Sequence, residues 1–180
     1  MRKALRLSAL LATLLALTPA ARADDARQAF LTDAFPAGVP APAALWLTGD
    51  KRARVGDILG HPPNALRVRY WAHGGRSAWI LEEIGKERPI TVGVVVADGR
   101  IDQLQILVYR ESRGGEVAAP FFTRQFRGAG LAPGGEGLDR HIDSISGATL
   151  SVGAVKRVAR EALYLAALIE TPANSHDDSH

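Results

Sequence analysis

Residues 90–109 read Ile90-Thr-Val-Gly-Val-Val-Val-Ala-Asp-Gly-Arg-Ile-Asp-Gln-Leu-Gln-Ile-Leu-Val-Tyr109 and carry the clearest structural signal in the chain. Their first part, residues 90–97, is dominated by valine, as is typical of a strand. Asp98-Gly99 predicts a tight hairpin turn, because glycine adopts positive φ angles without steric cost. Residues 101–109 then alternate polar and apolar side chains. The stretch therefore predicts an antiparallel β-hairpin.

The sheet extends upstream of this hairpin. Leu66, Val68 and Tyr70 alternate with arginines, which is strand spacing. A Gly-Gly turn separates this segment from residues 77–84, which are interpreted as the returning strand. These segments predict an antiparallel meander with one face on the core and the other in water.

Residues 151–169 change to a helical period. Their apolar residues recur at three- and four-residue steps, at Val155, Val158, Ala162, Leu165 and Ile169. The charged residues fall on the other side of the predicted helix, namely Lys156, Arg157, Arg160 and Glu161. We expect the apolar stripe to pack against the dry face of the sheet.

Two short helices are expected near the N-terminus. The first spans residues 24–35, with Phe30, Leu31 and Ala34 as candidate buried positions. The second follows Thr48, a residue type that caps helices. The predicted fold class is α+β: an antiparallel sheet packed against a C-terminal helix, with short N-terminal helices.

The first 23 residues have the pattern of a secretory signal peptide. A basic start, Met1–Arg6, is followed by the apolar run Leu7–Leu17 and by Ala21-Arg22-Ala23, a small-x-small cleavage pattern. The apolar run reaches only about half the length of a membrane-spanning helix. We expect cleavage near Ala23, a periplasmic location and no membrane span in the mature chain. The predicted divisions are 1–23 signal peptide, 24–64 N-terminal helical segment, 65–171 main domain and 172–180 polar tail.

The formal charge of +3 originates in the predicted signal peptide. That segment holds four of the 22 basic residues and no acidic one, so the rest carries 18 basic against 19 acidic residues. A near-neutral domain lacks the basic surface that phosphate backbones require, which argues against a nucleic-acid partner. The chain has no cysteine, which excludes disulfides, thiolate chemistry and Cys-ligated metals.

Familiar catalytic patterns are absent from the sequence. It contains neither a G-x-S-x-G elbow nor a G-x-x-x-x-G-K-[ST] loop. His61, His73 and His141 lack the spacing of metal ligands and fit surface or turn positions. We therefore assign no catalytic residue and no metal ligand.

One segment of small and hydroxyl residues leads directly into the predicted C-terminal helix, Asp143-Ser-Ile-Ser-Gly-Ala-Thr-Leu-Ser151. A helix N-terminus has unpaired N–H groups and a partial positive charge, so it can bind phosphate. Gly147 and Ala148 leave room for a bulky ligand near the backbone. The alternative is that one hydroxyl merely caps the helix: Ser146, Thr149 or Ser151.

Ser146-Gly-Ala-Thr149, with Asp143 three residues before Ser146, resembles the flavinylation motif of the FMN-binding domain family. That family includes components of the sodium-translocating NADH:quinone oxidoreductase and of the Rnf complex. In it an FAD:protein FMN transferase joins FMN through a phosphoester to the last Thr or Ser of the motif, which here is Thr149. The resemblance spans residues 79–169 and implies that 65–171 is an FMN-binding domain.

The resemblance also implies which residues contact the cofactor. The motif residues Ser146, Gly147, Ala148 and Thr149 would lie at the FMN phosphate. Glu111 and Ser112 belong to an element that resembles Glu-Thr-Pro-Gly in the family, and either could hydrogen-bond the flavin or its ribityl chain. Arg113 stands where that element has proline, which is a departure from the family pattern.

Other residues have two possible roles each. Asp143 is either recognised by the transferase or orders the loop before the helix. Glu111 is either a flavin contact or a surface carboxylate. The aromatic residues are candidates for stacking on the flavin or for the core: Trp79, Phe121, Phe122 and Phe126.

These residues predict an exported electron carrier with FMN esterified to Thr149, which relays electrons to or from a membrane or periplasmic redox partner. Without cysteine, the flavin must do the redox work. A stand-alone enzyme is less favoured, since nothing in the chain resembles a substrate pocket with an acid or base. Two alternatives stay open: a flavin-dependent reductase of a small acceptor, and a non-redox partner-binding protein in which Thr149 only caps a helix.

Overall fold

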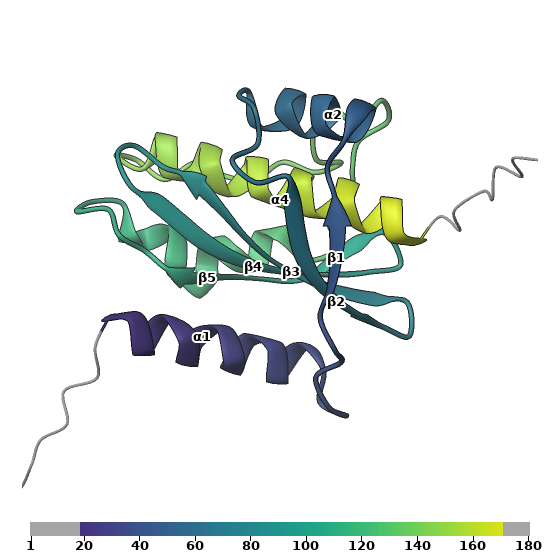
Figure 1. Cartoon of the computed structure of the whole chain (residues 1–180). Coiled ribbons are helices and arrows are strands. Elements are labelled where there is room, and N and C mark those ends of the chain that lie inside the picture. Colours follow the sequence, from purple (N-terminus) through teal and green to yellow (C-terminus); the bar gives the residue numbers. More distant parts are fainter. Residues whose placement is uncertain (1–18, 171–180) are drawn as a thin grey trace, which may run out of the picture.

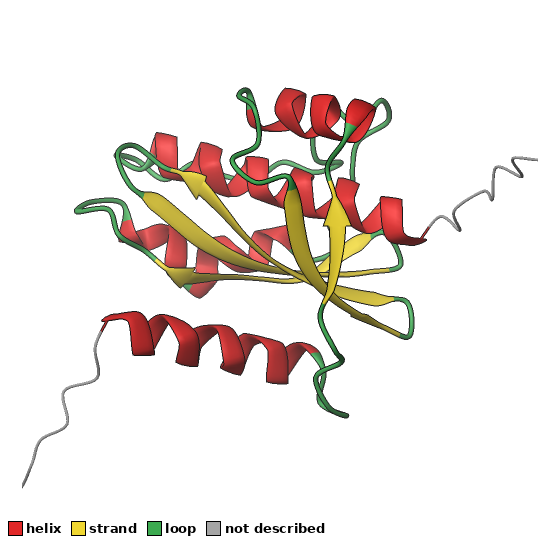
Figure 2. Ribbon diagram, viewed as in Figure 1, coloured by secondary structure: helices red, strands yellow, loops and turns green. Residues whose placement is uncertain are grey.

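The computed structural model describes residues 19–170, in which a five-stranded antiparallel sheet has helices on both faces (Figures 1 and 2). The strands pair in chain order: β1 Ala43–Trp46, β2 Arg67–His73, β3 Arg76–Ile84, β4 Pro89–Ala97 and β5 Arg100–Val108. The helices are α1 Pro19–Ala34, α2 Gly49–Leu59, α3 Pro120–Thr123 and α4 Thr149–Glu170, with 3-10 turns η1 Gly115–Ala118 and η2 Arg124–Phe126. The predicted α+β class is confirmed.

The predicted hairpins form with the expected turns. At the β4–β5 turn Asp98 has a φ angle of 51° and Gly99 one of 70°, as a two-residue turn with two positive φ angles requires. The β2–β3 turn uses Gly74 and Gly75, which also have positive φ angles. The strand boundaries fall within a few residues of those predicted, because the turn residues define them.

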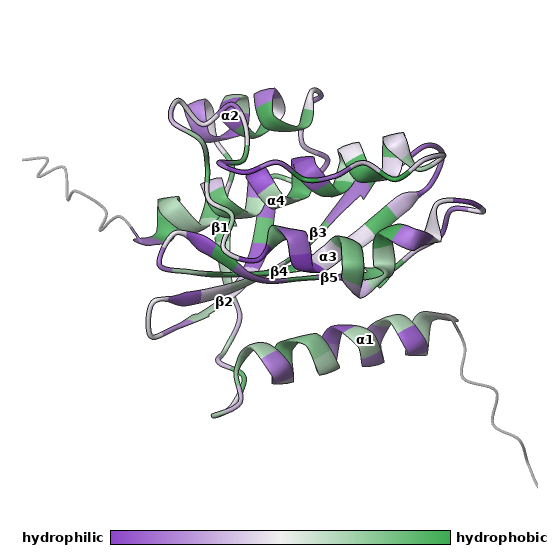
Figure 3. Ribbon diagram, turned by 180° about the vertical axis from the view of Figure 1, so that it is seen from behind, coloured by the Kyte–Doolittle hydropathy of each residue, from purple (hydrophilic) through white to green (hydrophobic). Residues whose placement is uncertain are grey.

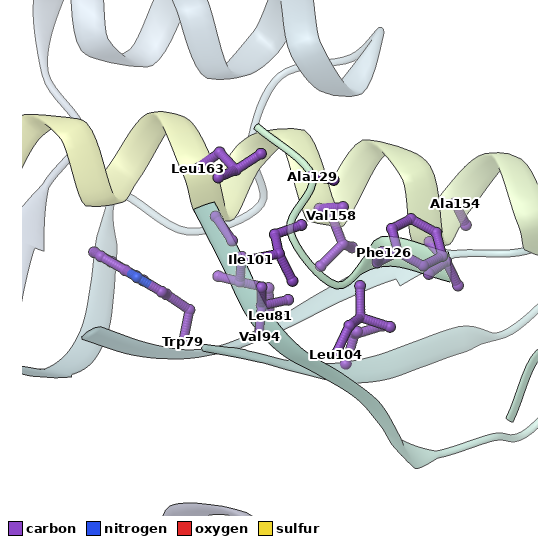
Figure 4. Packing of buried hydrophobic residues seen from close by; sticks show 14 of the residues in the cluster. Trp79, Leu81, Val94, Ile101, Leu104, Phe126, Ala129, Ala154, Val158 and Leu163 are labelled. Carbon is purple, nitrogen blue, oxygen red and sulfur yellow. The ribbon is translucent and has the colours of Figure 1, made fainter. Parts of the chain in front are cut away.

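One face of the sheet packs against α4. The predicted stripe residues Val155, Val158, Ala162 and Leu165 are all fully buried, as expected from their helical spacing. Figure 4 shows side chains from the sheet, among them Val94 and Leu104, close to side chains of α4. This core holds α4 at a fixed position on the sheet.

The other face of the sheet is covered by α1, which corrects the prediction that this face lies in water (Figure 1). Phe30, Leu31 and Ala34 are buried as predicted, but against Ala78 and Val95 on the face expected to be wet. Figure 3 shows hydrophobic and hydrophilic residues side by side along α1, as expected for a helix with one packed side. The unbroken valine run of β4 reflects burial on both faces.

Strand β1 is absent from the sequence prediction. Its four residues pair with β2 from Ala43–Tyr70 to Trp46–Arg67. The segment follows a proline-rich connector and shows no alternation in sequence, so no periodic signal marks it. Thr48 does occupy the position before α2, but its side chain makes no capping hydrogen bond, and α2 ends at Gly60 in the left-handed conformation.

The prediction that Glu161 lies on the outer, charged side of α4 is wrong. The helical spacing places it among the charged residues facing outward, yet it is only 5% exposed. Lys156, Arg157 and Arg160 are partly buried. The cause is tertiary, because α2 packs against α4 and removes this part of its outer side from water.

Several predictions concern residues outside 19–170. The basic and apolar parts of the predicted signal peptide, Met1–Arg6 and Leu7–Leu17, lie outside the described residues, as does the polar tail 172–180. Residues 19–23 form the start of α1. In the described range no helix has the length and apolar character needed to span a membrane.

Candidate functional site at the start of α4

The loop that leads into α4 is fastened to the sheet by ionic and backbone contacts. The Asp139 carboxylate accepts a hydrogen bond from the Gly130 N–H at 2.9 Å and from Arg100 Nη1 at 2.9 Å. These two donors hold the pKa of Asp139 below its usual value. Arg140 donates to the Arg127 carbonyl at 2.7 Å. The loop is thereby fixed before the helix begins.

A tight turn precedes α4. Gly147 has a φ angle of 79°, and the Ala148 N–H donates to the Ile145 carbonyl at 3.0 Å. The helix begins at Thr149, so the N–H groups of Thr149, Leu150 and Ser151 have no acceptor within the helix. They lie at the positive end of the helix dipole, where an anion is stabilised.

The three nearby hydroxyls differ in accessibility. Ser151 is buried, and its Oγ lies 3.0 Å from the hydroxyl of Tyr109. Because the Tyr109 hydroxyl donates to the Arg113 carbonyl, its oxygen accepts the proton of Ser151. Ser146 and Thr149 are exposed, and within residues 19–170 neither side chain makes a hydrogen bond. None of the three hydroxyls caps α4 in the described structure.

A cavity of about 390 Å³ lies at this helix terminus. It is lined by residues of three segments: Lys86, Glu87, Glu111, Ser112, Arg113, Gly147, Ala148, Thr149, Leu150 and Ser151. A second hollow of about 640 Å³ shares Ser112, Arg113 and Gly147 with it and adds Ser146. The six predicted cofactor residues therefore lie together around one composite site. Its size falls in the range of sites that bind cofactors.

Glu111 fastens the β3–β4 turn to the site. Its Oε1 accepts the backbone N–H groups of Lys86 at 2.6 Å, Glu87 at 2.7 Å and Arg88 at 3.0 Å. These hydrogen bonds, led by that from Arg88, hold the pKa of Glu111 below its usual value. Glu111 is thus neither a free surface carboxylate nor a free flavin ligand at Oε1. It positions the cavity wall that carries Lys86.

Two glycines permit the close approach of these segments. A Cβ added at Gly85 would lie 3.0 Å from Glu111 Oε1 and 3.3 Å from Ser151 Oγ. At Gly114, which has a φ angle of 81°, a Cβ would lie 2.9 Å from the Tyr109 hydroxyl. A larger residue at either position would push the cavity walls apart.

Asp143 lies before the motif, with its carboxylate in solvent. Its N–H donates to Gln125 Oε1 at 2.8 Å, so the backbone of the loop is ordered by Gln125. The carboxylate is exposed, and its Oδ1 lies 3.5 Å from His141 Nε2. The side chain itself is therefore accessible to another protein.

The predicted aromatic residues do not gather at the cavity. Trp79, Phe122 and Phe126 are fully buried in the core. Phe122 and Phe126 pack edge to face, and Trp79 stacks on Tyr70. Phe121 is 59% exposed and does not line the cavity. Three of the four aromatic residues therefore have the second of their two predicted roles, which is packing in the core.

Sequence reasoning missed part of the cavity. Lys86 and Glu87 reach it from the β3–β4 turn, and Leu150 lies beside Thr149 in the helix. Arg113 also lines it, at the position where the family element has proline. No local pattern marks Lys86 or Glu87, because the hydrogen bonds to Glu111 that place them join residues far apart in the chain.

Comparison with known proteins agrees with this geometry. No curated protein and no solved structure shows a significant match to the chain. The sequence model described as FMN-binding domain matches residues 85–164, a range that begins at the β3–β4 turn and ends in α4. The resemblance found in the sequence is confirmed: residues 85–164 of this chain match the FMN-binding domain family.

Proposed function

We propose that this protein is an exported electron carrier that holds FMN covalently through a phosphoester on Thr149. In the periplasm it relays electrons to or from a membrane or periplasmic redox partner. The family match supports flavin binding. The observation that carries the attachment site is the exposed Thr149 hydroxyl at the uncapped start of α4, inside the cavity.

The residues at this site fit a phosphate monoester. Three backbone N–H groups at residues 149–151 lack acceptors within the helix, and the side chains of Lys86 and Arg113 add positive charge to the lining. Two carboxylates also line the cavity: Glu111, whose Oε1 accepts three backbone N–H groups, and Glu87, which lies 3.6 Å from Lys86 Nζ. When bound, FMN supplies the electron transfer, and the chain holds and orients it.

Attachment by an FAD:protein FMN transferase is chemically balanced. The Thr149 oxygen forms a bond to the phosphorus of the FMN half of FAD, the bond to AMP breaks, and the hydroxyl proton is lost. Ser151 is unsuited to this reaction because its hydroxyl is buried and bonded to Tyr109. The exposed carboxylate of Asp143 supports the proposal that the transferase recognises this residue.

The test is to express the full chain in an exporting host together with the transferase. We expect the wild-type protein to carry a yellow flavin that survives denaturation, with FMN mapped to the peptide containing Thr149. Thr149→Val keeps the shape and removes the oxygen, so a folded protein without covalent flavin is expected. Thr149→Ser should retain some attachment.

Ser146→Ala is the matched control, because Ser146 is the other exposed hydroxyl at the site. It should leave the covalent flavin in place, whereas Asp143→Ala should reduce loading. Full covalent loading of Thr149→Val, or FMN mapped to Ser146, would refute the assignment.

A further inference from the structure

The sheet is open between β2 and β3. Their pairing runs from His73–Arg76 to Tyr70–Trp79 and ends there, although β3 continues to Ile84. Beyond this point residues 67–69 pair with β1, and residues 80–84 pair with β4. Figure 1 shows β1 and the first part of β2 standing apart from the strands β3 to β5.

This opening contains a cavity of about 320 Å³, which we call the slot. Its lining includes Val68 and Leu81 from the α4 face of the sheet and Arg69 and Ile80 from the α1 face. An adjoining hollow of about 380 Å³ on the α1 face shares Arg69 and Ile80 with it. The slot therefore leads through the sheet from one face to the other.

The end of the slot on the α4 face holds an acid without a partner. Glu161 is 5% exposed and lines the slot, and its carboxyl makes no hydrogen bond within residues 19–170. Its neighbour Glu83 is compensated, because it accepts hydrogen bonds from Arg157 at 2.8 and 3.0 Å and lies 3.1 Å from His61 Nε2. A buried carboxyl without a partner is costly, so Glu161 is the group that a ligand would satisfy.

The end of the slot on the α1 face carries more positive than negative charge, because Arg27, Arg67 and Arg69 line it together with one carboxylate, that of Glu82. Arg67 and Arg69 form no ion pair among the described residues, and Arg67 lies over the ring of Trp46. Arg27 Nε is buried without a partner, while its Nη1 lies 3.4 Å from Asp24 and its Nη2 lies 3.9 Å from Glu82. These guanidinium groups are placed to bind an anionic group.

We propose that the slot binds an elongated zwitterion, with its ammonium group at Glu161, its carboxylate at Arg27, Arg67 and Arg69, and an apolar body between Val68 and Leu81. An ω-amino acid has this chemistry, and so does a short peptide with free ends. The opposite charges at the two ends of the slot select against a diamine or a dicarboxylate, which would place a like charge at one end.

Titration calorimetry of the exported protein tests this. The probes are 4-aminobutanoate, 6-aminohexanoate, 8-aminooctanoate and triglycine, with 1,6-diaminohexane and adipate matched to the six-carbon compound. We expect one zwitterion to bind at least about tenfold more tightly than the matched diamine and diacid. Preference for triglycine over the ω-amino acids would identify the ligand as a peptide.

Two variants probe the two ends of the slot. Glu161→Gln and Arg69→Gln should each weaken zwitterion binding at least about tenfold. At pH 7 the wild type should also release a proton on binding, because an ammonium partner ionises Glu161, and Glu161→Gln should release none. Glu170→Gln and Arg52→Gln are the controls, since both residues are exposed and lie outside the slot.

Several outcomes of these measurements would overturn the proposal. These are no binding of any zwitterion, equal binding of adipate, and equal binding of 1,6-diaminohexane. Binding that Glu161→Gln leaves unchanged would also contradict it. Arg69 is exposed, so Arg69→Gln tests the site even if the variant in the core folds poorly.

Discussion

Gly93 shows how a single residue decides which face of the sheet a helix can cover. A Cβ built at this position would lie 2.8 Å from the ring of Phe30, closer than real contacts allow. Glycine inside a strand is usually unfavourable unless another group approaches closely. Here the approaching group is the ring of Phe30 in α1. Gly93 therefore marks the place where α1 covers the face that the alternation of the strands predicted to lie in water.

Replacing Gly93 by Ala should therefore destabilise the protein by ~1–3 kcal/mol, because the added methyl group overpacks the contact with Phe30. Chemical denaturation measures this. Gly137→Ala, where a Cβ meets nothing within 4 Å, should stay within ~0.5 kcal/mol. In the double variant with Phe30→Ala the cost of the methyl group should disappear, and an undiminished cost would contradict the packing of α1.

Glu161 makes stability depend on pH in a defined window. Burial first and Glu83 second raise the pKa of Glu161 from its ordinary value of 4.5 to about 8 in the folded chain. Between these values the folded chain keeps a proton that the unfolded chain has released. This contribution to stability is complete below pH 4.5 and is lost as the pH rises through about 8.

Glu161→Gln should remove that dependence. The stability of the variant relative to the wild type should rise between pH 5 and 8 by up to several kcal/mol, given ~1.4 kcal/mol per pKa unit. Glu83 and His61 interact with Glu161, and Arg157 binds Glu83; all three remain in both proteins, so the difference reports Glu161 together with its coupling to His61. Denaturation at a series of pH values measures it, with exposed Glu170→Gln as the control. A constant difference would show that Glu161 is already ionised.

At the scale of the element, α4 joins the core to the candidate site. Four residues of its apolar stripe, Val155, Val158, Ala162 and Leu165, are fully buried and Ile169 is partly buried, while the first residue of the helix carries the exposed hydroxyl of Thr149. Lys156 is held too, since its Nζ donates to the Ile142 carbonyl at 2.7 Å. The helix therefore fixes the loop before it as well as the cavity at its start.

Leu165→Ala should cost ~2–5 kcal/mol, because it leaves a cavity in the core between α4 and the sheet. Leu150→Ala removes the same atoms from the same helix at an exposed position and should stay within ~0.5 kcal/mol. Chemical denaturation compares the two. If Leu150→Ala proved the more damaging, α4 would have to be rotated about its axis.

Local signals account for what the sequence could predict. The turn at Asp98-Gly99 and the stripe of α4 are both predictable, because each depends on neighbours in the chain. The pairing of strand β1 with β2 and the packing of α1 on the second face of the sheet depend on residues distant in the chain, so the sequence did not predict them. At the site, the resemblance identifies Thr149 and Glu111. The hydrogen bonds that Glu111 accepts from the N–H groups of residues 86–88 join residues more than twenty positions apart, which no local pattern reveals.

At the scale of the whole molecule, two cavities lie beside the same sheet and the same helix, α4. The cavity at Thr149, which we propose to hold the flavin, lies where α4 begins, and the slot opens beside Glu161, further along the same helix. Thr149 and Glu161 both belong to α4, Thr149 at its first residue and Glu161 about three turns further along. A ligand in the slot and a flavin on Thr149 would thus contact a single rigid element.

The proposed export sets a condition on the fold, because cleavage near Ala23 would cut within α1, which begins at Pro19. The residues of α1 that pack on the sheet, Phe30, Leu31 and Ala34, all follow the cleavage point. We expect a chain that begins at Asp24 to keep its packing. A chain that begins at Pro36 should lose much of its stability, since each large apolar side chain removed from the core contributes ~1.5–3 kcal/mol.

Thermal unfolding of the two shortened chains, compared with the protein purified after export, measures this difference. The chain from Asp24 should match the exported protein, and N-terminal sequencing of the exported protein should begin at or near Asp24. Phe30→Ala in the chain from Asp24 should reproduce part of the loss seen on removing α1. An exported protein that retains Met1 would contradict the predicted signal peptide. A chain from Pro36 that is as stable as the chain from Asp24 would show instead that α1 contributes nothing to the fold.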